Sequence, residues 1–178
     1  MESKVNPWKA NFTNGLIMGL AGVIFTLVLW FLDLTFNKGV PYLFLVIAVF
    51  LLYYFIKMYR DNYLHGMITY GQSLGAGMII FVYSSIVSAI FGYLLYTVID
   101  PDLTGKALAF AEEQMRASGR VPEDMIDTSL EIQKKIMKPG IMMAMSFFSN
   151  IFFGLVISLI VSIFTRKEGN PLLDTAEK

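Results

Sequence analysis

The sequence has no cysteine and a single histidine, His65, among its 178 residues. The absence of cysteine excludes disulfides, thiolate metal sites and a cysteine nucleophile. A structural zinc ion usually takes four nitrogen or sulfur ligands, which one histidine cannot supply. We therefore expect no metal site and no cofactor, and we interpret His65 as a polar loop residue.

Charged residues are also scarce. They make up 16% of the chain, whereas soluble domains carry about 25%, and hydrophobic residues make up 56%. The 14 basic residues balance the 14 acidic ones, so no net field attracts nucleic acid. This composition predicts a protein of the lipid bilayer that does not bind nucleic acid.

The apolar residues gather in four long runs, and about 20 such residues suffice to cross a bilayer as a helix. The first run is too long for a signal-peptide core and lacks a small-residue cleavage site, so we interpret it as an uncleaved span. Pro139-Gly140 marks a break before the last run. We expect a single membrane domain over residues 1–178, with spans at about 12–36, 40–56, 70–99 and 141–165.

Residues 100–138 differ from the rest because they mix eight acidic with six basic side chains. Helical signals persist there: Asp100-Pro101 is typical of a helix start and Ser118-Gly119 of a helix end. A second helix, starting near Pro122, carries an apolar stripe along one side. The chain is therefore predicted to be all-α and polytopic, with four transmembrane helices and an amphipathic hairpin between the third and fourth.

Small and polar residues recur at helical spacing within three of the spans. Such stripes let helices approach closely and form hydrogen bonds in lipid, so we predict helix packing along them, within one chain or between protomers. A transport path along the last span is the alternative reading of the same pattern. The predicted packing residues are Gly15 and Gly19 in the first span, Ser84, Ser88 and Gly92 in the third, and Ser146, Asn150, Gly154, Ser158 and Ser162 in the fourth.

Asp33 is the one carboxylate inside the first apolar run. A carboxylate within a membrane raises the hypothesis of a proton relay. Its place near the end of the run favours the other interpretation, a side chain that reaches the interface and Lys38.

The distribution of basic residues predicts the orientation of the chain. Lysine and arginine gather on the cytoplasmic side of membrane proteins. We therefore expect both termini in the cytoplasm and the hairpin outside, because Lys4, Lys9, Lys57, Arg60, Arg166 and Lys167 lie on one side, against Lys38, Lys134, Lys135 and Lys138 on the other.

The segment that leads into the third span carries a motif: Tyr59-Arg60-Asp61-Asn62, then Gly66-Met67-Ile68-Thr69-Tyr70-Gly71-Gln72-Ser73-Leu74, then Gly77. With four spans and the hairpin before the last, it resembles a domain of unknown function found in uncharacterised bacterial membrane proteins common in Bacteroidota. The resemblance covers nearly the whole chain and implies an inner-membrane location. It implies no catalytic residue.

Within the loop over residues 57–77, four side chains are candidates for contact with a lipid headgroup or a partner: Arg60, His65, Tyr70 and Gln72. The glycines nearby could instead shape the turn between two spans. Membrane lipid, a membrane-protein partner and a second copy of the chain are the partners we expect.

Three functions remain open at this point. The chain carries no nucleophile elbow, phosphate-binding glycine loop or zinc-protease motif, so we expect a non-enzymatic accessory or scaffolding subunit that docks another membrane protein. The alternative is a small oligomeric transporter or channel for a lipid-linked or small polar molecule. A lipid-modifying enzyme acting through Arg60, His65, Tyr70 and Gln72 is the third.

Overall fold

The computed structural model describes residues 5–37 and 39–168. Apart from one pair of bridged residues, the described chain consists of helices and their connections. Four helical stretches are long and apolar enough to cross a membrane: Pro7–Phe31, Tyr42–Tyr63, Tyr70–Ile99 and Pro139–Thr165. The predicted fold class is thus confirmed, and the protein is an all-α, multi-pass membrane protein. In chain order the elements are α1 (Pro7–Phe31), α2 (Pro41–Tyr63), α3 (Tyr70–Leu94), the π-helical turn η1 (Leu95–Ile99), α4 (Leu103–Ser118), α5 (Glu123–Ile136) and α6 (Pro139–Thr165).

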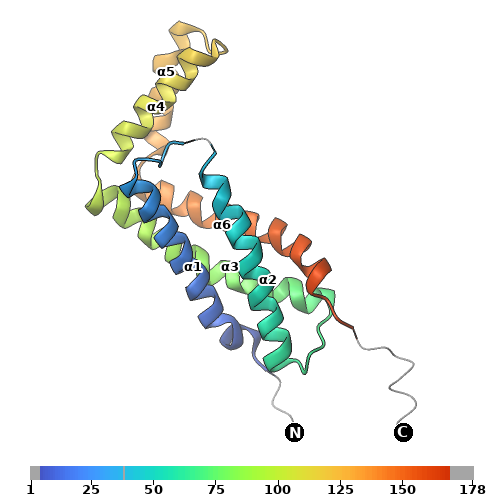
Figure 1. The fold of residues 1–178 in the computed structure, drawn as a ribbon. Helices are drawn as coiled ribbons and strands as arrows, with labels where there is room; N and C mark the ends of the chain where they lie inside the picture. The colour runs from blue at the N-terminus through green and yellow to red at the C-terminus, as the bar shows by residue number, and fades with distance from the viewer. Residues whose placement is uncertain (1–4, 38, 169–178) are drawn as a thin grey trace, which may run out of the picture.

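Helix α3 is the centre of the membrane bundle. It packs most extensively against α1 on one side and α6 on the other, while α2 makes smaller contacts with all three (Figure 1). Because the bilayer removes the hydrophobic drive between helices, close van der Waals packing has to hold them together. The buried apolar core includes Met18, Leu52, Phe55, Ile56, Ile80, Phe81, Ile157 and Val161.

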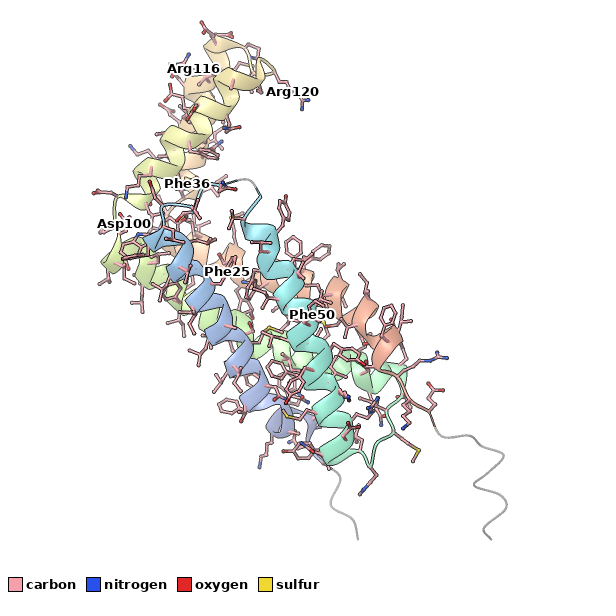
Figure 2. The ribbon with its side chains drawn as sticks, in the orientation of Figure 1. Phe25, Phe36, Phe50, Asp100, Arg116 and Arg120 are labelled. Carbon is pink, nitrogen blue, oxygen red and sulfur yellow. The ribbon has the colours of Figure 1, made fainter. Side chains whose placement is uncertain are left out.

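The outward faces of the bundle remain strongly apolar. Phe31 is 82% exposed and Phe50, on α2, is 70% exposed (Figure 2). Acyl chains cover such a surface in a bilayer, so no protein partner is needed to explain it.

Helix α1 begins at Pro7 and ends at Phe31, whereas we expected a span over 12–36. It starts earlier because the Asn6 side chain accepts the Trp8 amide and caps the first turn. It ends earlier because Asp33 adopts a left-handed conformation with φ of 56°. The amides of Asp33 and Leu34 then bond back to the carbonyls of Trp30 and Leu29, a Schellman ending.

Asp33 therefore lies beyond the helix and is exposed. The structure gives it a place in the turn that ends α1. Lys38, which we paired with it, lies outside the described residues.

The later spans differ from their expected limits at the ends as well. Helix α2 continues to Tyr63 instead of stopping at residue 56, because a helix can extend past the apolar run into water. Helix α3 and η1 together match the expected 70–99. Helix α6 begins at Pro139, where a proline fits the first turn, so the predicted break coincides with a helix start.

Helices α4 and α5 form an antiparallel hairpin, here called the arm (residues 103–136). It projects from one end of the bundle (Figure 1). We call this the arm end. The opposite end holds the start of α1, the loop over residues 64–69 and the end of α6, and we call it the loop end.

Candidate functional site

The motif-bearing loop at the loop end joins α2 to α3 through a tight turn. His65 and Gly66 both adopt positive φ, of 53° and 79°. The Arg60 carbonyl accepts the amides of Leu64 and Gly66, which closes the end of α2. A glycine at position 66 is required because larger residues are strained in that conformation.

A capping box then starts α3. The Thr69 hydroxyl accepts the Gln72 amide at 3.3 Å, and the Gln72 side chain accepts the Thr69 amide at 3.0 Å. These reciprocal bonds satisfy two amides that a helix start leaves without intrahelical partners. Gln72 is thus engaged in forming the helix start.

The same loop is fastened to the end of α6. Ile68 and Lys167 exchange two backbone hydrogen bonds, of 2.8 and 2.9 Å. One turn further into α3, the Ser73 hydroxyl is hydrogen-bonded to the Thr165 hydroxyl, and both are buried. The family-like motif therefore links three helix ends, those of α2, α3 and α6.

Arg60 takes part in this link through its side chain. Its Nη1 donates to the Thr165 carbonyl at 3.4 Å, and its Nε donates to Asp61 at 2.8 Å. Carbonyls in the last turn of a helix lack intrahelical partners, and a nearby cation complements the helix dipole there. Arg60 thus caps the end of α6.

The two other candidate contact residues of this loop have different surroundings. The Tyr70 hydroxyl donates to the Leu159 carbonyl of α6 at 3.2 Å. His65 is exposed. Arg60 and Tyr70 are therefore bonded to α6, Gln72 caps the start of α3, and His65 is exposed on the surface.

Several predicted packing residues lie at close helix contacts. A side-chain carbon at Gly15 would come within 2.5 Å of Tyr83, and one at Gly19 within 2.7 Å of Val87. Ser88 faces Gly22 of α1, and Ser84 is buried. These contacts hold α1 against α3 within one chain.

The contact between α3 and α6 is equally tight. Gly154 lies against Phe81, and a side-chain carbon at Gly77 would come within 2.5 Å of the Ser158 hydroxyl. Ser158 and Ser162 are fully buried, and their hydroxyls have no hydrogen-bond partner within the described part of the chain.

The remaining predicted packing residues lie away from this contact. Gly92 meets no described atom within 4 Å of a built side-chain carbon. Ser146 is exposed and Asn150 half-buried. Between Pro139 and Phe153, α6 has no residue that is fully buried among the described residues, so the predicted stripe enters the core only from Gly154 onward.

At the arm end, Asp100 joins the arm to the bundle. Its carboxylate accepts the Trp30 indole N–H at 3.0 Å and the Lys106 ammonium at 2.9 Å. Asp100 does not cap α4 as its place before Pro101 predicts, because the chain makes another turn and α4 begins at Leu103. Figure 2 shows Asp100 at this junction, close to Phe36, whose ring stacks on Phe110 of α4 at 5.5 Å.

The bond to Lys106, and after it the bond to Trp30, holds the pKa of Asp100 below its ordinary value. The hydrogen bond to Asp100 in turn raises the pKa of Lys106. Sequence reasoning missed Trp30 in this role. The available signal was weak: tryptophan is enriched at membrane interfaces, but its partner lies 70 residues away.

The arm holds itself together with a small apolar seam. Leu103 and Ala107 of α4 and Ile126 of α5 are buried, and α4 and α5 pack against each other. Toward the tip, Arg116 bridges Glu112 at 3.1 Å and Glu123 at 3.6 Å. Figure 2 places Arg116 and Arg120 at the far end of the arm.

One face of α5 remains uncovered. Met125, Ile132 and Ile136 are 54%, 53% and 42% exposed. Their spacing of seven and four residues places them on one stripe of the helix. We call these three residues the α5 stripe.

No group of three or more histidine, aspartate or glutamate side chains within the described residues is arranged to hold a metal ion. A shallow hollow on α1 is lined by apolar residues alone: Ile24, Leu27, Val28, Phe31 and Leu32. At bilayer depth it is suited to acyl chains.

The family model described as "Protein of unknown function (DUF4199)" matches residues 13–167. The chain belongs to this family. The match begins within α1 and ends at Lys167, which is bridged to Ile68, so it includes most of the first span, the three other spans and the arm. No curated protein and no solved structure matches the chain.

Proposed function

We propose that this DUF4199 member is a non-enzymatic accessory or scaffolding subunit that docks another membrane protein through its arm. The observation that carries the proposal is the α5 stripe. An apolar helix face outside the bilayer is a recognised docking mode for a second helix. The arm is also fixed to the bundle, by Asp100 and by the Phe36–Phe110 stack, so the stripe is held in a defined position.

The charge of the arm favours a protein partner over the bilayer surface. Helix α5 carries the acidic residues Glu123, Asp124, Asp127 and Glu131 against two lysines, Lys134 and Lys135. Helices that lie on membranes are rich in lysine and arginine on their polar face. An anionic surface would repel the first half of α5.

The packing of α6 gives transport less support. Of the polar residues that suggested a path, Ser158 and Ser162 are fully buried, and Ser158 meets Gly77 of α3 directly. A permeation path needs open polar surface.

The proposal includes an inner-membrane location in Bacteroidota, with both termini in the cytoplasm and the arm outside. What supports it is the resemblance in the motif loop and the excess of lysine and arginine beside the first and last spans. Lipid and a membrane-protein partner are the partners proposed.

The sequence contains no cysteine, so an engineered one is its single thiol. We would attach a short photo-crosslinker at Ile132→Cys, on the α5 stripe, and irradiate cells that produce the protein at its native level. The proposal expects an adduct with one integral membrane protein, at high yield. Introducing Met125→Asp in the same chain should remove the adduct, because it places a charge in the same apolar contact.

Lys134→Cys is the matched control. It lies two residues further along α5, about 200° around the helix, and should give no such adduct. Equal adducts from both positions, or none from Ile132→Cys, would contradict the docking role.

A further inference from the structure

The two ends of the molecule differ in charge. At the loop end the described residues include five cations, Lys9, Lys57, Arg60, Arg166 and Lys167, but two carboxylates, Asp61 and Glu168. At the arm end the balance is reversed: Lys106, Arg116, Arg120, Lys134, Lys135 and Lys138 oppose Asp33, Asp100, Asp102, Glu112, Glu113, Glu123, Asp124, Asp127 and Glu131. The loop end alone therefore attracts anions.

Three of its cations lie near one carboxylate, Asp61, and one of them is ion-paired with it. Asp61 is paired with Arg60 at 2.8 Å, and the charges of Lys57 and Lys167 also act on it. Lys57 lies one helical turn before Asp61, while the two-way bridge to Ile68 fixes the backbone of Lys167. Because Asp61 is already engaged, the cluster keeps an excess of positive charge.

The ammonium groups of Lys57 and Lys167 are available to a ligand. Both residues are exposed, and neither has a carboxylate within ion-pair distance among residues 5–37 and 39–168. Arg60, by contrast, has 15% of its side chain exposed and is held between Asp61 and Thr165. The cluster thus has two exposed lysine side chains beside one guanidinium that is held in place.

The depth of the cluster matches the headgroup layer. The helical path along α1 from Lys9 to Trp30 rises about 31 Å at ~1.5 Å per residue. A hydrocarbon layer is roughly 30 Å thick. On α2, exposed Tyr53 and Tyr54 lie one turn before Lys57, where amphipathic rings are expected at the interface. We therefore expect the ammonium group of Lys57 to reach the level of the lipid phosphates.

We propose that Lys57 and Lys167, together with Arg60, bind the phosphate of an anionic phospholipid against the ends of α2 and α6. Phosphate offers several acceptor oxygens to the three cations, and the apolar outer surface of α2 and α6 accommodates the acyl chains. This site is independent of the arm and of any partner on it. It assigns the ligand contact to Lys57 and Lys167 beside Arg60, whereas Tyr70 is bonded to the Leu159 carbonyl of α6 and Gln72 caps the start of α3.

The test uses purified full-length protein in nanodiscs of phosphatidylcholine, with phosphatidylglycerol added in increasing amounts. Retention of lipid, measured by native mass spectrometry, gives the affinity. We expect binding of phosphatidylglycerol to weaken about thirty-fold in Lys57→Gln/Lys167→Gln, given the usual strength of two lysines near an anionic surface. Arg60 is left unchanged because it caps α6.

Two controls separate a site from general attraction. Lys134→Gln/Lys135→Gln removes the same charge at the arm end and should leave the affinity within about twofold. Lys9→Gln removes a charge at the loop end on a different helix and should have an equally small effect. A loss in Lys9→Gln as large, per charge, as in the double variant would overturn the proposal.

The chemical source of the phosphate is tested in parallel. Inorganic phosphate at matched concentrations should not compete with phosphatidylglycerol, since it brings no acyl chains. Effective competition would show that a free anion, not a lipid, is the ligand. Equal retention of phosphatidylcholine and phosphatidylglycerol would also overturn the proposal.

Discussion

Gly77 of α3 packs directly against Ser158 of α6. A Cβ atom built at Gly77 would lie 2.5 Å from the Ser158 hydroxyl oxygen. Gly75, two residues earlier on the same helix, has no described atom within 4 Å of that position. The two glycines therefore share a helix and differ in their surroundings.

This difference predicts opposite effects of one substitution. Gly77→Ala should destabilise the protein by about 1–3 kcal/mol, because the α3–α6 contact must open to admit a methyl group. Gly75→Ala should be neutral or stabilising by up to about 1 kcal/mol, since alanine favours helix and meets no obstacle. Thermal unfolding in a mild detergent compares the two. Equal destabilisation would show that the contact at Gly77 is looser than the structure has it.

Small and polar residues at helical spacing coincide with close helix contacts at some positions but not at others. The pattern selected Gly15, Gly19, Gly154 and Ser158, which the structure places against α3. The pattern also selected Ser146 and Gly92, which the structure does not place at such a contact. A stripe can run along the whole length of a helix, whereas two crossing helices touch over only a few turns. The position of the crossing point cannot be read from the sequence of either helix alone.

Among the elements, the arm depends on a charged junction. Asp100 bonds Trp30 of α1 and Lys106 of α4, so one carboxylate connects a span to the arm. A carboxylate whose pKa is lowered stabilises the joined state above its ordinary value of 3.8 and loses that effect as the pH falls through the lowered pKa. Lys106, whose pKa is raised, contributes below its ordinary 10.5 and ceases to do so as the pH rises through the raised value.

We therefore expect the arm to loosen at strongly acidic pH. The indole N–H signal of Trp30, followed by NMR in micelles, should shift as the pH is lowered below about 4. Trp8→Phe identifies the signal, because the chain has two tryptophans. In Asp100→Asn this acid transition should be absent. A transition that persists in that variant would assign the titration to another group.

The lengths of the elements show where hydropathy is informative and where it is not. The apolar runs located all four spans, because lipid tolerates little else. They could not locate the ends of α1 and α2, which continue through Asn11 and Lys57 into the interface. Helix ends are set by local capping, as at Asn6, Asp33 and Thr69, and hydropathy does not register a cap.

For the molecule as a whole, the sequence indicated four spans and a hairpin but not their arrangement. That α3 lies between α1 and α6 follows from contacts between residues far apart in the chain, such as Gly15 with Tyr83. The link between the loop and the end of α6 was likewise invisible, because backbone pairing of Ile68 with Lys167 needs no particular side chain.

The arrangement makes a prediction about topology. The arm and the loop end lie at opposite ends of the bundle, and the lysine and arginine distribution is the basis of our proposal that the arm lies outside. Arg120→Cys, at the tip of the arm, should react with an impermeant maleimide in intact cells. Asn62→Cys, exposed at the loop end, should react after permeabilisation alone. The reverse result would invert the orientation, and labelling of both from outside would contradict the four-span arrangement.

The fastening at the loop end also has a consequence for biogenesis. The partners of the Arg60 side chain and of Ser73 on α6 lie 105 and 92 residues further along the chain. A chain is made from its amino terminus, so α1, α2 and α3 enter the membrane while the ribosome is still producing the arm. The Arg60 Nη1, the Ile68 backbone and the Ser73 hydroxyl then lack these partners until the last residues of α6 emerge. The loop end can therefore be fastened only after α6 has been synthesised, and a product truncated before Thr165 would lack the partner of Arg60 and Ser73 on α6.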